Sequence, residues 1–254
     1  MNEIVKIHND LTNEKLGKMN AKELDLFMSI CHKMRDTGTD RVVIDFSELR
    51  KLGHFSATSN KILADELIQA NSKLLEFKVL IKNGSKTKQR TLFKEFETDE
   101  ETLTVTCEAW EETAYILTDV VKNFTRFDLD EFVSLESKYA KRLYKLLKQY
   151  RTQGNYYTSK ETFYRDMNVA STYKNPDFNK RVLHPAVEEC KKYIPSLKCV
   201  PRKGGRGGAV LGYDFTFNRE IPPEQPKKKI KNKFNEFEQQ QLDISELEKQ
   251  ILSN

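Results

Sequence analysis

Residues 175–218 read NPDFNKRVLHPAVEECKKYIPSLKCVPRKGGRGGAVLGYDFTFN, and this stretch decides the fold. Its first part, 175–194, opens with an Asn-Pro pair that suits a helix N-cap and first turn, and its apolar residues then recur at the helical period. Pro185 lies inside this predicted helix, so we expect a kink near Arg181, because a proline ring clashes with the carbonyl four residues before it. Two β-prone segments and a glycine-rich, basic loop follow, at 196–201, 210–218 and 202–208. The stretch therefore predicts a helix followed by a β-hairpin.

The same order of elements precedes this stretch and also occurs earlier in the chain. Thr158-Ser-Lys-Glu161 is a capping box that opens a short helix ending at Met167, and 134–150 carries an apolar stripe at the helical period. The first half predicts helices at 20–37, 47–52 and 57–75, then strands at 76–82, 89–97 and 102–107. The two copies are offset by roughly 110 to 120 residues, which suits a duplicated domain better than a solenoid repeat.

A short helix, a longer helix and a β-hairpin form the outline of a winged helix-turn-helix, in which the second helix of the pair lies in the DNA major groove. The predicted fold class is α+β, with two tandem winged-helix domains and a C-terminal tail that is expected to be disordered. The predicted boundaries are 1–119 for the N-terminal domain, 120–219 for the C-terminal domain and 220–254 for the tail. Many α+β domains share this order, so the order alone carries little weight.

Three local features of the first half carry further expectations. Ser47 is expected to cap the short second helix, which Gly53 ends. Ile62 and Ile68 are expected on the apolar, inward side of the third helix. Trp110 and the predicted helix Ala109–Leu117 are expected to pack between the two halves rather than bind a ligand.

The composition indicates a soluble globular protein without a membrane or export signal. Apolar residues make up 38% of the chain and charged residues 32%. No apolar run approaches the ~18 residues that a membrane span needs. The first ten residues are polar and have neither the apolar segment nor the cleavage site of a signal peptide. We expect a cytoplasmic protein.

The cysteines and histidines indicate neither disulfides nor a metal site. Cys31, Cys107, Cys190 and Cys199 are widely spaced and form no CxxC pair, so they are expected to be free thiols. The four histidines show no ligand spacing. The sequence predicts no metal and no cofactor.

The charge is distributed unevenly along the chain. The net charge is −4 over 1–119, +10 over 120–219 and −1 over 220–254. An excess of ten positive charges in one domain indicates a polyanion partner, and nucleic acid is the commonest such partner. A merely solvated basic surface is the alternative.

The helix 175–194 carries the candidate base-reading residues. Arg181 is the candidate for a bidentate contact with guanine, because its planar fork matches the O6 and N7 edge, and Asn179 could read adenine. The other candidate DNA-binding residues on this helix are Lys180, His184, Lys191 and Lys192. In the hairpin loop they are Arg202, Lys203 and Arg206, which are expected to contact phosphates. The alternatives are the solvated face of an amphipathic helix and a flexible hairpin tip.

The first half offers a weaker set of candidates. Its third helix starts with Ser59, Asn60 and Lys61, and its hairpin carries Lys86 and Lys88. Because this half is net acidic, secondary DNA contact combined with a protein–protein role fits it better. In the tail, the segment Lys233–Leu252 contains a few separated apolar residues and is expected to dock on a partner. An inert solubilising tail is the alternative.

The chain resembles the initiator (Rep) proteins of iteron-containing, theta-replicating plasmids over about residues 15 to 220. The stretches that carry the resemblance are Leu24–Phe27, Asp45–Gly53, Ser134–Tyr150, Phe163, Phe178–Glu188, Lys203–Arg206 and Tyr213–Phe217. The resemblance implies that the C-terminal domain is the main reader of directly repeated origin sequences (iterons), while the N-terminal domain dimerises or makes secondary DNA contacts. It also implies a homodimer in exchange with a monomer, repression of the protein's own gene, and host initiator and helicase proteins as partners.

An enzyme is not expected. A nicking initiator of the rolling-circle type would need a tyrosine beside a metal held by an HxH-type motif, and an ATPase would need a phosphate loop; the sequence has neither motif. A winged-helix transcriptional repressor without initiator activity remains the alternative.

Overall fold

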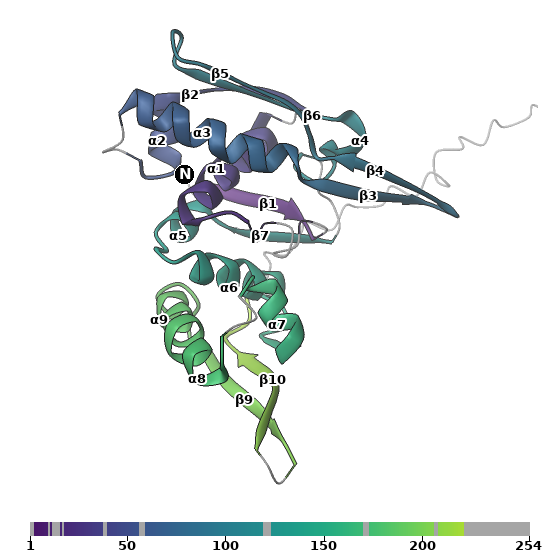
Figure 1. The fold of residues 1–254 in the computed structure, drawn as a ribbon, viewed down its shortest axis with the longest axis vertical. Helices are drawn as coiled ribbons and strands as arrows, with labels where there is room; N and C mark the ends of the chain where they lie inside the picture. The colour runs from purple at the N-terminus through teal and green to yellow at the C-terminus, as the bar shows by residue number, and fades with distance from the viewer. Residues whose placement is uncertain are drawn as a thin grey trace, which may run out of the picture. The chain divides into compact units, whose positions relative to one another are not determined.

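Two copies of a helix–helix–hairpin unit follow one another within Met1–Glu220 (Figure 1). The computed structural model describes residues 3–9, 11, 16, 18–37, 40–55, 59–118, 123–169, 173–205 and 208–220. The first domain contains β1 (Ile4–His8), α1 (Ala21–Thr37), β2 (Arg41–Asp45), α2 (Phe46–Leu52), α3 (Asn60–Leu75), β3 (Lys78–Asn83), β4 (Lys86–Thr91), β5 (Phe93–Asp99), β6 (Thr104–Ala109), α4 (Glu111–Ala114), β7 (Phe124–Asp128) and α5 (Leu129–Val133). The second contains α6 (Lys138–Gln149), β8 (Asn155–Ser159), α7 (Lys160–Asp166), α8 (Asn175–Phe178), a π-helical turn (Asn179–Leu183), α9 (His184–Lys191), β9 (Lys198–Gly204) and β10 (Ala209–Thr216). The predicted α+β fold with two winged-helix domains is confirmed.

The first domain has a three-stranded antiparallel sheet in the order β2-β6-β5. Strand β2 alternates between the two faces: Val42 and Ile44 are buried, while Val43 between them is exposed. Strands β3 and β4 form a separate hairpin that extends away from the helices (Figure 1). Gly84 adopts a φ of +59° in the turn between these two strands.

Strands from the two ends of the first domain pair with each other. β1 pairs antiparallel with β7, with Val5 opposite Phe127 and Ile7 opposite Thr125. The side chains of Val5 and Ile7 are fully buried, so this ladder belongs to the core of the domain. The division of the chain at residues 119 and 120 stays a prediction, but this ladder joins residues on its two sides.

The second domain has a three-stranded antiparallel sheet in the order β8-β10-β9. The rings of Phe163, Phe178, Tyr213 and Phe215 meet on its inner face, with the Phe163 centroid 5.2 Å from Tyr213 and 5.5 Å from Phe215. Gly212 allows β10 to lie close to β8, because a Cβ there would lie 2.3 Å from the Thr158 carbonyl oxygen. This aromatic core holds the helices of the second domain against the hairpin.

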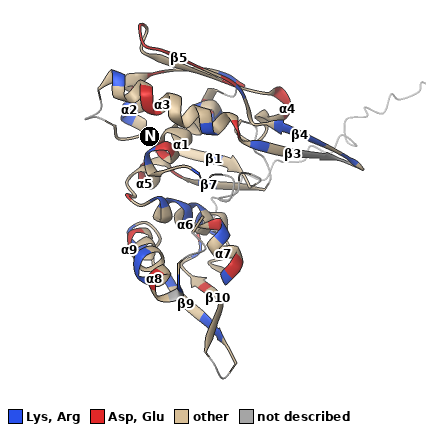
Figure 2. Ribbon diagram, in the orientation of Figure 1, with Lys and Arg blue, Asp and Glu red and all other residues tan. Residues whose placement is uncertain are grey.

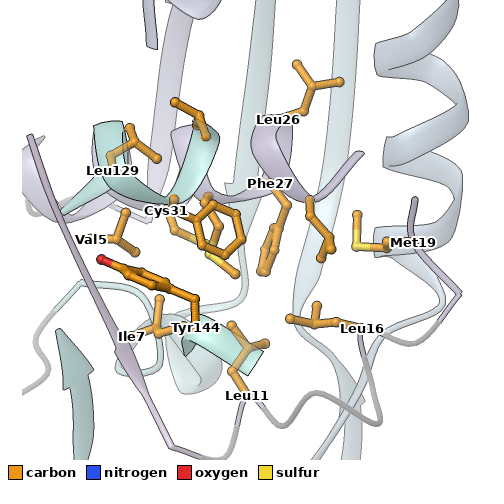
Figure 3. Packing of buried hydrophobic residues seen from close by; sticks show 14 of the residues in the cluster. Val5, Ile7, Leu11, Leu16, Met19, Leu26, Phe27, Cys31, Leu129 and Tyr144 are labelled. Atoms are coloured by element: carbon orange, nitrogen blue, oxygen red, sulfur yellow. The ribbon is translucent and has the colours of Figure 1, made fainter. Parts of the chain in front are cut away.

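Helix α6 lies between the two domains, and every residue from Ala140 to Lys148 is buried. On one side its Tyr144 ring packs edge-on against Phe127 of β7, with ring centroids 5.8 Å apart. Figure 3 shows Leu11, Leu16 and Met19 in one apolar cluster with Phe27 of α1 and Tyr144 of α6. On the other side the Cys190 thiol of α9 lies 3.4 Å from the Ala140 carbonyl oxygen. One helix therefore contributes to both cores.

Several local expectations in the first half are wrong. Asp45, not Ser47, occupies the N-cap position of α2, although Gly53 ends that helix as expected. Ile62 and Ile68 are 52% and 48% exposed, because α3 turns only its other face to the core. Trp110 does not lie between the domains: its Nε1 donates to Thr91 Oγ1 at 3.2 Å, within the first domain.

The second half also departs from the expected caps. The cap of α7 is Ser159, whose Oγ accepts from the Thr162 backbone N–H at 3.2 Å, whereas Thr158 belongs to β8. Asn175 is the first residue of α8 rather than its cap. The irregularity expected near Arg181 is present as the π-helical turn Asn179–Leu183, in which the His184 N–H donates to the Asn179 carbonyl.

The expectations on cysteines and membrane spans can be compared with the described residues. All four thiols are free; Cys31, Cys107 and Cys190 are buried, and Cys199 is partly buried. Burial raises the pKa of the Cys199 thiol to about 12, so it is unreactive near neutral pH. Among the helices in the described ranges, none has the length and apolar content to cross a membrane. The described part of the chain contains no cluster of three His, Cys, Asp or Glu side chains suited to hold a metal ion.

Candidate DNA-binding surface

The helix that carries the predicted base readers is built from α8, the π-helical turn and α9. Pro185 has no N–H to donate to the Arg181 carbonyl, and the backbone accommodates this with the wider turn just before it. The buried side of the helix is formed by Phe178, Val182, Leu183, Ala186, Val187 and Cys190, as the apolar periodicity predicts. The other side of the helix carries polar and charged side chains.

The exposed side of this helix carries the predicted cations. Lys180, Arg181, His184, Lys191 and Lys192 are all exposed. The Arg181 side chain is 69% exposed, with its Nε 3.9 Å from an Asp177 carboxylate oxygen, and Lys191 pairs with Glu188 at 2.7 Å. No described side chain pairs with Lys180 or Lys192. Figure 2 shows Lys and Arg, in blue, along the helix formed by α8 and α9.

Asn179 differs from its neighbours because it is only half-exposed. Its Oδ1 atom is buried and has no hydrogen-bond partner among the described residues. A buried amide oxygen without a partner is costly, so this group favours a ligand or solvent donor. Asn179 is therefore available for a polar contact, although it lies deeper than a fully projecting base reader.

The helix and the hairpin share one concave surface. A cavity of about 220 Å³ lies between them, lined by Asn179, His184 and Lys191 on the helix and by Cys199, Pro201 and Tyr213 on the hairpin strands. Of the exposed residues of the helix, His184, Glu188 and Lys191 therefore face the Cys199 and Pro201 side of β9. This is the arrangement in which a helix enters a groove while a wing lies beside the adjacent backbone.

Arg202 and Lys203 lie in β9 of the β9–β10 hairpin (the wing) rather than in its loop, and the two side chains are not equivalent. Lys203 is exposed, and no described side chain pairs with it. The Arg202 guanidinium donates two hydrogen bonds to Asp214, at 2.9 and 2.6 Å, and stacks on the Tyr157 ring at 4.0 Å. These hydrogen bonds raise the pKa of Arg202 and neutralise its charge locally. Arg206 lies outside the described residues.

In the first domain, three of the five predicted DNA-binding residues contact other residues of the same domain. Ser59 caps α3 by accepting from the Ile62 N–H at 3.3 Å, and Asn60 Oδ1 accepts from Arg50. Lys61 is exposed at the start of α3. On the β3–β4 hairpin, Lys86 is exposed near the turn, while Lys88 lies 3.9 Å from Glu112. Lys61 and Lys86 are the predicted residues of this domain that are exposed and unpaired among the described residues.

The charge count of the second domain overstates its surface charge. Four of its twenty cations, Lys141, Arg142, Lys145 and Lys148, are buried on α6. Helical periodicity alone predicts that these four cations face solvent, and only their tertiary contacts show that they are buried. The exposed cations of residues 120–219 include those of α8–α9 and of the β9–β10 hairpin, while the tip of the β5–β6 hairpin in the first domain is acidic (Figure 2).

Comparisons with known proteins agree with this arrangement. A family model described as "Initiator Replication protein, WH1" matches residues 4–148, and one described as "Initiator Rep protein, WH2" matches 159–217. A protein of Bifidobacterium longum (strain NCC 2705), "Probable replication protein rep", is 38% identical over 235 residues, which cover 91% of this chain and 78% of that protein.

A solved structure shows a similar fold. It is titled "Crystal structure of Pi initiator protein in complex with iteron DNA" and superimposes with a TM-score of 0.69, covering 86% of this chain and 98% of that chain at 14% sequence identity. The two family models together span most of the chain, and the relative matches nearly all of it. The chain belongs to the initiator replication protein family.

Proposed function

We propose that this initiator binds directly repeated DNA sequences at a replication origin, and that α8–α9 with the wing is its main reading surface. The observation that carries the proposal is the shared concave surface, at which exposed His184 and Lys191 of the helix face Cys199 and Pro201 of β9. Lys180, Lys192 and Lys203 have no described partner, so each is available to a phosphate.

Base reading would fall to Arg181 and Asn179. The Arg181 guanidinium is mostly exposed, and its described ion pair with Asp177 is long, at 3.9 Å. Arg181 can therefore release Asp177 and donate to the edge of a guanine. Paired hydrogen bonds from Asn179 to adenine would require its buried, unpartnered Oδ1 to turn toward the groove. The first domain would add weaker contacts through Lys61 and Lys86.

The remaining roles follow from the family and from the tail. The initiator would work as a homodimer in exchange with a monomer, and host initiator and helicase proteins would be recruited through Lys233–Leu252. It would act in the cytoplasm by binding and opening DNA, without a catalytic reaction of its own. Repression of its own gene would use the same surface.

Footprinting of the full chain on the DNA upstream of its own gene tests this function. Tandem protection with a repeat of about two helical turns, accompanied by permanganate-reactive thymines in an adjacent AT-rich segment, is the expected result. A single protected site without any opened thymines would instead support the winged-helix repressor.

A further inference from the structure

Residues Ala140 to Lys148 of helix α6 are all buried, although four of these nine residues are Lys or Arg. Each of these cations reaches a carbonyl or carboxylate oxygen of another segment. Lys141 pairs with Asp25 of α1 at 2.6 Å, Lys145 donates to the Leu11 carbonyl, and Lys148 pairs with Glu220 at 2.6 Å. A buried cation is tolerated only where such oxygens are in place, so α6 depends on segments far from it in the chain.

Arg142 donates hydrogen bonds to backbone carbonyls of both domains. Its guanidinium donates to the carbonyls of Leu16 at 3.4 Å and Met19 at 3.0 Å, which precede α1 in the first domain. It also donates at 2.9 Å to the carbonyl of Met167, the C-cap residue of α7 in the second domain. Arg142 is 1% exposed. One planar fork thus joins segments that lie about 150 residues apart.

The chemistry of the acceptors explains why an arginine fits. The last carbonyls of a helix lack intrahelical donors and carry the negative end of the helix dipole, so the end of α7 attracts a cation. The Leu16 and Met19 carbonyls lie where the chain turns into α1. The five N–H donors of a guanidinium have fixed directions, and a lysine ammonium cannot reproduce their spread over three carbonyls.

We propose that Arg142 is a positioning residue that fixes the orientation of the second winged-helix domain relative to the first. α6 packs on α1 and β7 on one side and on α9 on the other, and Arg142 links the segment before α1 to the end of α7 across this seam. The consequence is that α3 and α8–α9 are held at one separation. The effect of this fixed orientation on DNA binding rests on the function proposed above, whereas the positioning role of Arg142 does not.

Pulsed electron–electron spin resonance tests the positioning role without DNA. Spin labels at Gln69 of α3 and Glu188 of α9, both exposed, are introduced into the full chain with Cys199→Ser. The unsubstituted chain should give one narrow distance distribution, and Arg142→Gln should broaden or shift it. Phe163→Leu is the matched control, because Phe163 is equally buried but packs only within the second domain, and it should keep the distribution narrow.

A distribution in Arg142→Gln that matches the unsubstituted chain overturns the proposal, as does equal broadening in Phe163→Leu. If Arg142→Gln does not fold by circular dichroism, Arg142→Lys takes its place and is judged by the same criterion. Hydroxyl-radical footprints of these variants then separate the two proposals. A broadened distance distribution, together with loss of only the part of the footprint that the first domain protects, supports both the positioning role and the proposed function. A broadened distribution with an unchanged footprint supports the positioning role and overturns DNA contact by the first domain.

Discussion

At the scale of single residues, neighbouring cations on the second domain have different surroundings and therefore different expected roles. The Arg181 side chain is exposed, and its Nε lies 3.9 Å from an Asp177 carboxylate oxygen. The Arg202 guanidinium instead donates two hydrogen bonds to Asp214, at 2.9 and 2.6 Å. Lys180 and Lys203 are exposed and have no described partner. Exposure and pairing, rather than residue type alone, separate candidate base readers from candidate phosphate contacts.

Arg181→Ala is expected to lower the affinity for the specific site by about 1–3 kcal/mol, because it removes a bidentate base contact. Affinity for random DNA should change much less. Lys180→Ala is the matched control, since it removes an exposed cation one residue away and should weaken both kinds of DNA alike. Fluorescence anisotropy titrations with both duplexes measure the difference. Equal losses on the two duplexes in Arg181→Ala would exclude base reading by this residue.

Lys203→Ala is expected to reduce the slope of log K against log salt by about 0.9, the contribution of one phosphate contact. Arg202→Ala should reduce it less, because Asp214 already neutralises that guanidinium. The slopes come from titrations between about 50 and 200 mM salt. A larger change in Arg202→Ala than in Lys203→Ala would show that the ion pair opens on DNA.

At the scale of elements, α6 has the apolar periodicity of a helix, and four of its Lys and Arg side chains are buried. The Lys145 ammonium is fully buried, and burial lowers its pKa to about 7. The folded state then prefers neutral Lys145, while the unfolded chain keeps it protonated up to about pH 10. Stability from this group is present at high pH and is lost as the pH falls toward 7.

The free energy of unfolding should therefore rise between pH 7 and 8.5, with a slope of up to about 1.4 kcal/mol per pH unit from this group. Lys145→Met should flatten that rise. Lys138→Met, on the partly exposed start of the same helix, should keep it. Urea denaturation at several pH values measures the slopes. The same slope in Lys145→Met and the unsubstituted chain would mean that another group titrates in this range.

The elements also show how far the sequence could predict the structure. Local patterns are sufficient for α1, α3, α6, α9 and the β9–β10 hairpin, because their apolar period or turn residues are explicit. The predicted strand 89–97 is wrong, since the structure divides it at Leu92 into the end of β4 and most of β5. β7 and β8 were not predicted, because each is short and is defined by its partner: β7 by β1, about 120 residues earlier, and β8 by β10. The wing and the exposed helix face could be located from the sequence, but the Arg202–Asp214 pair and the depth of Asn179 depend on tertiary packing.

At the scale of the whole molecule, Lys141, Arg142, Lys145 and Lys148 illustrate the same limit. Their side chains raise the net charge of the second domain, and the sequence gives no sign that they point inward. Arg142 and the Leu16 carbonyl are 126 residues apart in the chain. No local pattern contains such a contact, so the charge count indicates a polyanion partner without locating the surface that binds it.

Removal of residues 221–254 is expected to leave specific DNA binding unchanged within about twofold, a difference of only ~0.4 kcal/mol, because the reading surface lies within Met1–Glu220. Replication from the origin should fall strongly if Lys233–Leu252 recruits host proteins. Anisotropy and a plasmid maintenance assay measure the two effects. Full replication activity in the truncated protein would indicate an inert tail.

The central claim is that the duplex lies against α8–α9 and the near edge of β9, and photo-crosslinking tests it most directly. A photoreactive amino acid replaces either His184 on this surface or Val200 on the outer face of the sheet, both of which are exposed. The full chain is irradiated on the DNA upstream of its own gene. The account predicts crosslinks from position 184 at regularly repeated bases and almost none from position 200. Crosslinks from position 200 with none from position 184 would contradict it.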